Sequence, residues 1–106
     1  MSELEKSVEK KLKDMVERRG GLCLKWVCPG WSGVPDRIVL MPEGRVYFVE
    51  LKRPKGGKLE PLQEWWAKRL QGLDFECLSV KNKAELAAFE LHIRQGKKTK
   101  RKDENL

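Results

Sequence analysis

The stretch that decides the fold is residues 33–52, which read GVPDRIVLMPEGRVYFVELK. Two mainly apolar runs, 36–41 and 45–52, flank the short turn Pro42-Glu43-Gly44, which contains both a proline and a glycine. Alternating apolar runs joined by so short a connection are typical of a β-hairpin. We therefore predict two antiparallel strands at the centre of the fold.

Pairing these strands about the turn sets Glu50 roughly opposite Asp36, while alternation along the strand puts Glu50 and Lys52 on one face. Two neighbouring carboxylates repel each other unless a positive charge lies between them. Mg²⁺ prefers oxygen ligands and keeps places for water and substrate phosphate. These residues indicate metal-assisted phosphodiester hydrolysis, with Lys52 orienting the water or neutralising charge in the transition state. The alternative is an ordinary Glu50–Lys52 ion pair on the solvated face of a sheet.

The rest of the chain supplies helices around these strands. Apolar spacing predicts a helix over 3–19, ended by Gly20-Gly21, and a second helix from Pro61 to Leu73. A third helix begins at the N-cap Asn82 and runs through Ile93. We further expect strands over 22–28 and 75–80 and a loop over 29–35. The second helix has an apolar stripe of Leu62, Trp65, Trp66, Leu70 and Leu73. The predicted order is αβββαβα, a mixed α/β domain.

Length and charge limit the classes of protein that this chain can represent. Its 106 residues suit one domain, which we place at residues 1–95, followed by a basic tail at 96–106 that we expect to be disordered. The net charge of +7 favours a nucleic-acid partner, and the tail either aids solubility or contacts phosphates. We find no membrane span and no signal peptide, and three scattered cysteines suggest a reducing interior.

Gly33-Val34-Pro35-Asp36 followed by Glu50-Leu51-Lys52 resembles the PD-(D/E)XK nuclease superfamily. With Gln63 in the next helix, the chain resembles the VRR-NUC (virus-type replication-repair nuclease) family in particular, in its stand-alone phage or bacterial form. The resemblance runs from about residue 8 to residue 80 and implies a restriction-endonuclease-like core.

The resemblance also implies a role for each residue of the motif. It assigns metal binding to Glu9, Asp36, Glu50 and the backbone carbonyl of Leu51, catalysis to Lys52, support of the site to Gln63, and loop shaping to Gly33 and Pro35. Helical spacing alone puts Glu9 at the edge of the buried stripe, where a solvated charge is the usual alternative.

Basic and aromatic residues near the motif are candidates for DNA contact. The segment 52–58 carries four basic residues and no acidic one, and we expect DNA to contact Lys25, Trp31, Arg37, Arg53, Lys55 and Lys58. Trp31 either stacks on a base or caps the core, whereas Trp65 and Trp66 pack in the core or an interface. A zinc site is disfavoured because Cys23 and Cys28 face opposite ways on one strand. The sequence contains no phosphate-binding loop of the kind that would indicate a nucleotide cofactor.

The resemblance implies an endonuclease dependent on Mg²⁺, with Mn²⁺ as a possible substitute. It further implies a homodimer that cuts branched DNA, including Holliday junctions, and leaves 5′-phosphate and 3′-hydroxyl ends. The expected place of action is the cytoplasm of a bacterium or of a phage-infected host. A two-fold dimer suits a junction that needs two cuts. Two alternatives stay open: a non-catalytic nucleic-acid-binding module, and a nicking or site-specific endonuclease acting on duplex DNA.

Overall fold

The computed structural model of the chain describes residues 3–51 and 61–96, and within them the side chains from Lys6 onward. Its elements are α1 (Glu3–Arg18), β1 (Leu22–Lys25), β2 (Arg37–Met41), a 3₁₀ turn (Pro42–Gly44), β3 (Arg45–Glu50), α2 (Pro61–Gly72), β4 (Glu76–Ser79) and α3 (Lys83–Gln95). The predicted αβββαβα order and fold class are confirmed. The predicted tail, beyond Gly96, lies outside the described residues.

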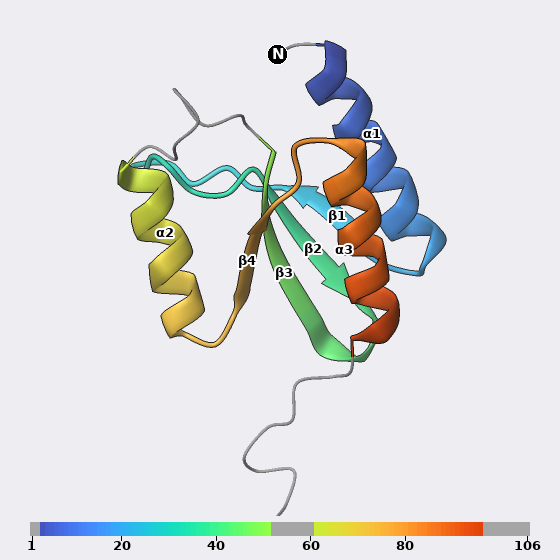
Figure 1. Cartoon of the computed structure of the whole chain (residues 1–106). Helices are drawn as coiled ribbons and strands as arrows, with labels where there is room; N and C mark the ends of the chain where they lie inside the picture. Colours follow the sequence, from blue (N-terminus) through green and yellow to red (C-terminus); the bar gives the residue numbers. More distant parts are fainter. Residues whose placement is uncertain (1–2, 52–60, 97–106) are drawn as a thin grey trace, which may run out of the picture.

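The four strands form one mixed sheet in the order β1-β2-β3-β4. The first three are antiparallel neighbours, and β4 runs parallel to β3. A parallel pair needs a crossover connection, and the connection from β3 to β4 contains α2. Figure 1 shows α2 on one side of the sheet, and α1 and α3 on the other.

The central hairpin has the predicted turn. Met41 pairs with Arg45, so the two strands close directly around residues 42–44. Within the turn Glu43 and Gly44 have φ values of 71° and 74°, a left-handed conformation that glycine adopts without a steric penalty. The turn fixes the register of β2 against β3, and the register in turn fixes which side chains meet at the far end of the hairpin.

The core lies between the sheet and the two helices α1 and α3. The apolar stripe of α1 is buried as predicted, because its residues recur every three or four positions. The core consists of Val8, Leu12, Met15, Val16, Cys23, Val39, Met41, Tyr47, Val49, Leu51, Val80, Phe89 and Ile93. At the surface of this layer, Arg19, which directly follows α1, pairs with Glu90 of α3 at 2.9 Å.

The start of α3 also follows the prediction. Asn82 has an extended backbone, and its side-chain oxygen accepts a hydrogen bond from the Glu85 amide at 2.8 Å. The Glu85 carboxylate accepts one from the Lys81 amide at 2.7 Å. The first bond satisfies an amide that a helix start leaves unpaired, and the second ties the residue before the cap to the first turn of α3. Among the described residues, no helix has the length and apolarity needed to cross a membrane.

Two expectations were wrong. The first strand is shorter than predicted and ends at Lys25, because the chain turns around Pro29-Gly30, where the Trp31 amide bonds to the Cys28 carbonyl. The apolar stripe of α2 is mostly open. Only Leu70 is buried, and Leu62, Trp65 and Leu73 remain about half exposed. The reason is that α2 lies mainly against β4 and leaves much of the sheet face beside it uncovered.

Candidate active site

The hairpin register sets Asp36 and Glu50 side by side. Arg37 pairs with Val49, so one step further along the antiparallel ladder Asp36 stands opposite Glu50, as predicted. Directly opposite residues point to the same face of a sheet. β1 and β4 extend this line across all four strands, because the Trp26 amide bonds to the Asp36 carbonyl and Glu50 pairs with Ser79. We call Trp26, Asp36, Glu50 and Ser79 the site row.

The carboxylate of Asp36 is held by the opposite strand. Its Oδ2 accepts a hydrogen bond from the Leu51 amide at 2.8 Å. This bond crosses the hairpin just beyond Glu50 and fixes the Asp36 side chain against the end of β3. The preceding Pro35 is buried, so the loop enters β2 in a constrained position.

Gly33 brings that loop against α2. Its φ of +81° lies in the left-handed region, and a Cβ built on it would lie 2.6 Å from Leu62 Cβ. No side chain fits at that distance without a shift of the Leu62 backbone. The loop is tied to α2 a second time, because the Trp66 ring nitrogen donates to the Ser32 carbonyl at 3.0 Å. Both contacts lie within four residues of Asp36.

Glu50 is the one buried charged side chain among the residues that the structure describes, with 6% of its surface exposed. Burial of a carboxylate is costly unless other groups compensate the charge. Glu50 lines a cavity of about 200 Å³ together with Pro35, Cys77, Leu78 and Ser79 of the sheet side and Gln63, Ala67 and Gln71 of α2. The structure therefore brings Gln63 to the same cavity as Glu50.

Sequence reasoning missed Ala67, Gln71, Cys77 and Ser79 as neighbours of Glu50. The signal for the α2 residues was available, since positions 63, 67 and 71 recur every four residues and share one helix face. For Cys77 and Ser79 no signal existed, because the pairing of β4 with β3 is set by a distant crossover. Burial, and after it the charge of Glu50, raises the pKa of the Cys77 thiol to about 11.

Glu9 is placed differently from the other two carboxylates. Its side chain pairs with the guanidinium of Arg37, which follows Asp36 and so points to the opposite face of the sheet, toward α1. Within residues 3–51 and 61–96, no three His, Cys, Asp or Glu side chains gather to form a metal site. Glu9 therefore does not join Asp36 and Glu50 in this structure, and its role as a ligand stays a prediction.

The donor set at the site row fits a hard divalent cation. Asp36 and Glu50 supply carboxylate oxygens from adjacent strands, and Mg²⁺ binds proteins through one or two carboxylates while keeping several waters. The burial of Glu50 favours the same partner, because a cation offsets a charge that is costly to bury. Asp36 and Glu50 are the residues that would hold the ion.

Some of the candidate DNA contacts lie in the part of the chain that the structure describes, and others lie outside it. Lys52, Arg53, Lys55 and Lys58 lie outside the described part of the chain. Lys25 is exposed, whereas Arg37 is partly buried against Glu9. Trp31 is 61% exposed, and its ring meets the ring of Trp66 edge-on at 5.7 Å. Trp66 in turn meets Trp26 of the site row at 5.8 Å, so a line of aromatic rings leads from the surface to the site.

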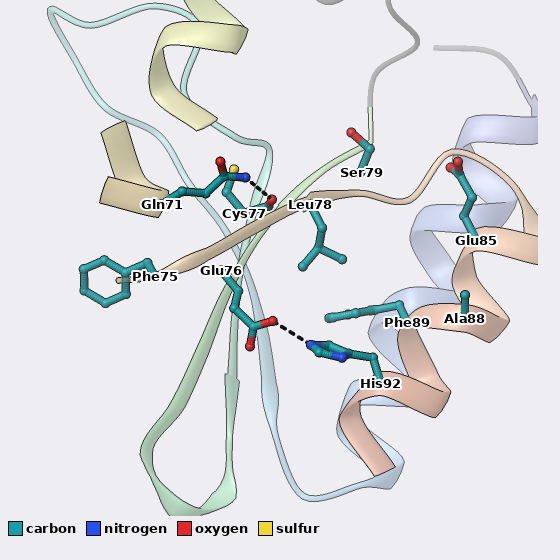
Figure 2. A pocket seen from close by; sticks show the side chains of 10 residues that line it. All are labelled: Gln71, Phe75, Glu76, Cys77, Leu78, Ser79, Glu85, Ala88, Phe89 and His92. Atoms are coloured by element: carbon teal, nitrogen blue, oxygen red, sulfur yellow. Dashed lines mark hydrogen bonds and ion pairs between the residues drawn. The ribbon is translucent and has the colours of Figure 1, made fainter. Parts of the chain in front are cut away.

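A larger cavity of about 480 Å³ lies on the other side of β4 (Figure 2). It runs along the outer edge of β4, with Phe75 and Gln71 at one end and Ala88, Phe89 and His92 of α3 at the other. Two interactions cross it: Gln71 donates to the Cys77 carbonyl at 3.2 Å, and His92 pairs with Glu76 at 2.6 Å. Neither Asp36 nor Glu50 lines this cavity, but it adjoins the cavity of Glu50, because Gln71, Cys77, Leu78 and Ser79 line both.

Three comparisons with known proteins agree with this geometry. The family model described as the VRR-NUC domain matches residues 4–82. A protein of Acyrthosiphon pisum secondary endosymbiont phage 1, named "Putative nuclease p44", is 49% identical over 59 residues, which are 56% of this chain and 62% of that protein. The match thus spans less than two thirds of the phage protein. A solved structure described as "VRR_NUC domain" superposes with a TM-score of 0.77 at 28% identity, over 91% of this chain and 100% of that one.

Proposed function

The chain belongs to the VRR-NUC domain family, and from that premise we propose that it is a nuclease, more closely a Mg²⁺-dependent endonuclease that hydrolyses phosphodiester bonds in branched DNA. We include Holliday junctions among the substrates and a homodimer as the working form. The observation that carries the proposal is the hairpin register, which sets Asp36 opposite the buried Glu50, with Gln63 in the same cavity.

Each residue of the site has a distinct task in this proposal. The Leu51 amide holds the Asp36 carboxylate in place, and the Val80 amide, which donates to the Glu50 carbonyl at 2.9 Å, holds the backbone of Glu50. The Asp36 carboxylate and the backbone of Glu50 are thus fixed before substrate arrives, which reduces reorganisation during the reaction. Gln63 faces the same cavity from α2 and is placed to orient Glu50 or a water beside it.

Mg²⁺, when held by Asp36 and Glu50, supplies a water of lowered pKa and polarises the phosphoryl group. We assign to Lys52 the orientation of that water and the neutralisation of charge that grows on the phosphate oxygens. We keep the Leu51 carbonyl as a further ligand. Mn²⁺ is expected to substitute, because it takes the same oxygen ligands.

Substrate binding is proposed to rest on charge and on exposed aromatic rings. The net charge of +7 attracts the phosphate backbone. Lys25 is exposed at the end of β1, on the face opposite the site row, since it pairs with Arg37. Trp31 is available to stack on an unpaired base, such as those at a branch point, because 61% of its surface is exposed. We propose that the protein acts in the cytoplasm of a bacterium or a phage-infected host.

The test is cleavage of a synthetic four-way junction in Mg²⁺ and in EDTA by the full chain and its variants. Asp36→Asn keeps an oxygen that accepts the Leu51 bond but removes the charge, and Glu50→Gln keeps the volume of the buried side chain. We expect each variant, and Lys52→Ala, to lose at least about 100-fold in rate. Glu64→Gln, an exposed carboxylate on α2 beside Gln63, is the matched control and should cut at the parent rate.

Two other outcomes would contradict the proposal and indicate a different function. Tight, salt-sensitive binding without cleavage in any divalent ion would make the chain a nucleic-acid-binding module. Equal cleavage of linear, flapped and four-way DNA of the same length would make it a nicking or site-specific endonuclease. Titration of Mn²⁺ into the parent and into Glu50→Gln, followed by calorimetry, tests the metal site without reference to activity.

A further inference from the structure

The four tryptophans of the chain form one cluster, although they come from three separate segments. Trp66 of α2 lies at its centre, and its ring meets those of Trp26, Trp31 and Trp65 edge-on, at 5.8, 5.7 and 5.1 Å between centroids. Trp26 belongs to the site row, so the cluster begins at the candidate active site. The cluster continues onto α2, on the side of the sheet opposite α1 and α3 (Figure 1).

Trp65 is the member of this cluster that α2 turns toward solvent. Helical spacing from Leu62 predicted a packed ring at this position. The helix instead lies mainly against β4 and buries only Leu70 among its residues. Trp65 is therefore 49% exposed, and one part of its ring is open to a ligand while another part rests on Trp66.

The open part of Trp65 borders a surface cavity on α2. The cavity has a volume of about 260 Å³ and is lined by Trp65, Lys68, Arg69 and Gly72. These residues recur every three or four positions, which puts them on one face of the helix. Gly72 has open space where a Cβ would lie, so nothing closes the cavity at that end. The cavity thus combines an exposed aromatic ring with basic side chains.

The two basic side chains of the cavity are not equivalent. Lys68 pairs with Glu64 at 2.9 Å, one turn earlier in α2. Arg69 takes part in none of the ion pairs among the residues that the structure describes. The Arg69 guanidinium is therefore the group of this face that is available to an added anion, and its planar fork matches two oxygens of a phosphate.

An exposed indole ring beside a guanidinium suits a single strand of nucleic acid. Every base has a π-face that stacks on an aromatic ring, and the phosphate of the same strand pairs with a basic side chain. A base inside a duplex is already stacked on its neighbours, so such a ring selects unpaired nucleotides. A second copy of the chain is a poorer occupant, because a two-fold contact on this face would bring the basic side chains of both copies together.

We propose that Trp65 and Arg69 form a binding site for an unpaired strand of DNA beside the active site. The indole ring stacks on a base, and the guanidinium holds a neighbouring phosphate. The rings of Trp65 and Trp26 lie 5.1 and 5.8 Å from that of Trp66, so they are at most about 11 Å apart. Roughly three nucleotides of a strand, at about 3.4 Å each, cover that distance. The site thus holds the strand within a few nucleotides of the site row.

The inference rests on the proposed function, since it takes DNA as the substrate, and it adds a preference among DNA structures. A branch with unpaired nucleotides can place a base on Trp65, whereas a fully paired junction must first release one from its stack. Of two branched substrates of equal length, the one with unpaired nucleotides at the branch should therefore bind more tightly.

The test is the affinity of the full chain for a labelled single-stranded oligonucleotide, measured by fluorescence anisotropy in EDTA, where metal-dependent cleavage does not interfere. We expect Trp65→Ala to bind about tenfold more weakly, and Trp65→Phe, which keeps a ring, to stay within about threefold of the parent. Affinity for a blunt duplex of the same length should stay unchanged in both variants. Leu91→Ala is the matched control, because Leu91 is 50% exposed but lies on α3. Circular dichroism verifies that each variant is folded.

The salt dependence of binding tests the phosphate contact separately. The loss of one phosphate contact lowers the slope of log affinity against log salt concentration by about 0.7 for a single strand, and we expect this decrease in Arg69→Met. Arg94→Met removes the same charge from an exposed position on α3 and should leave the slope unchanged.

Several results would overturn the inference. A parent protein that does not bind the single strand excludes the site, and so does a Trp65→Ala variant that binds it as tightly as the parent or loses duplex affinity equally. An unchanged slope in Arg69→Met, or an equal decrease in Arg94→Met, removes Arg69 from the site. A change of mass in Trp65→Ala, measured by light scattering, would place Trp65 in a protein contact instead.

Glu50→Gln separates this inference from the proposed function. This variant should lose cleavage and keep the affinity of the parent for the single strand in EDTA. A parent protein that binds the strand through Trp65 but cuts no DNA would refute the nuclease proposal and leave the binding site standing. Cleavage that persists while Trp65→Ala binds like the parent would refute the binding site alone.

Discussion

The contact between Glu9 and Arg37 decides how many carboxylates the site row contains. Arg37 lies between Asp36 and the rest of β2, and the alternation of the strand turns its side chain toward α1. There the guanidinium neutralises Glu9 in a partly buried pair, with side chains 15% and 22% exposed. Two of our sequence predictions, a metal-binding Glu9 and a DNA-binding Arg37, therefore meet in one ion pair, and each role requires that pair to open.

We predict that Glu9→Gln raises the Mg²⁺ concentration for half-maximal cleavage by about tenfold if Glu9 leaves Arg37 to bind the metal. Arg37→Met should then lower that concentration, because it removes the competing partner. Lys25→Met, a basic residue paired with Arg37 across the strands, is the control for the loss of positive charge. Measured Mg²⁺ dependence of junction cleavage decides the question.

A different pattern would assign Glu9 a structural role. If Glu9→Gln and Arg37→Met each lower the free energy of unfolding by about 1–2 kcal/mol while the Mg²⁺ dependence stays unchanged, the ion pair only stabilises the fold. Their double variant should then cost no more than either single change, since both remove the same interaction.

The loop before β2 shows how one element positions the site through its contact with another. It must reach the site row from β1 and still let α2 pack closely enough to bring Gln63 to the cavity of Glu50. A glycine at position 33 satisfies both demands, because it accepts the left-handed backbone and leaves room for Leu62. Gly33, the motif residue without a reactive side chain, thus links the strand that carries Asp36 to the helix that carries Gln63.

We predict that Gly33→Ala lowers the free energy of unfolding by about 2 kcal/mol, because it adds backbone strain and a contact with Leu62 that is too short. Gly30→Ala is the matched control, since Gly30 has a similar φ of +84° but nothing lies within 4 Å of its Cβ position. It should cost only about 1 kcal/mol. Chemical denaturation measures both. Equal losses would mean that α2 shifts freely and that Gly33 is required for its backbone conformation alone.

The molecule as a whole is built in two unequal layers. One face of the sheet is closed by α1 and α3, and buries a cysteine and a tyrosine within its core. The other face holds the site row and α2, and leaves Leu22 and Leu24 of β1 about half exposed. The closed layer contains most of the buried apolar residues, whereas the open layer carries the site row on which the proposed function depends.

Stability should depend on pH through two thiols, those of the buried Cys23 and the partly buried Cys77. Burial raises the pKa of Cys23 to about 11, and burial together with Glu50 does the same for Cys77, from a usual value of 9.0. The unfolded chain loses these protons first, so the stabilisation is complete below pH 9 and is lost as the pH rises toward 11. Burial also raises the pKa of Tyr47, which acts in the same direction above pH 10.

We expect the melting temperature of the parent protein to fall between pH 9 and pH 10.5, and to fall less steeply in a Cys23→Ala, Cys77→Ala double variant. Cys28→Ala is the control for removal of a cysteine outside the core. Thermal unfolding followed by circular dichroism at a series of pH values gives the comparison. The same slope in the double variant and the parent would show that other groups govern the loss.

The sequence by itself determined the hairpin, its register and hence the meeting of Asp36 with Glu50, and also the stripe of α1 and the cap at Asn82. These features depend on the period of a strand or helix and on short turns, so neighbouring residues specify them. The resemblance added Gln63, which periodicity alone left as a surface amide.

Only the tertiary structure determined which residues of other elements each helix and strand contacts. It paired Glu9 with Arg37, brought Cys77 and Gln71 to the cavity of Glu50, and left Leu62, Trp65 and Leu73 of α2 and the leucines of β1 open. Periodicity shows that a face is apolar but not whether another element covers it, because the cover comes from residues far away in the chain or from another molecule. That is why the apolar stripe of α2 could be predicted from the sequence, whereas the half exposure of Leu62, Trp65 and Leu73 could not.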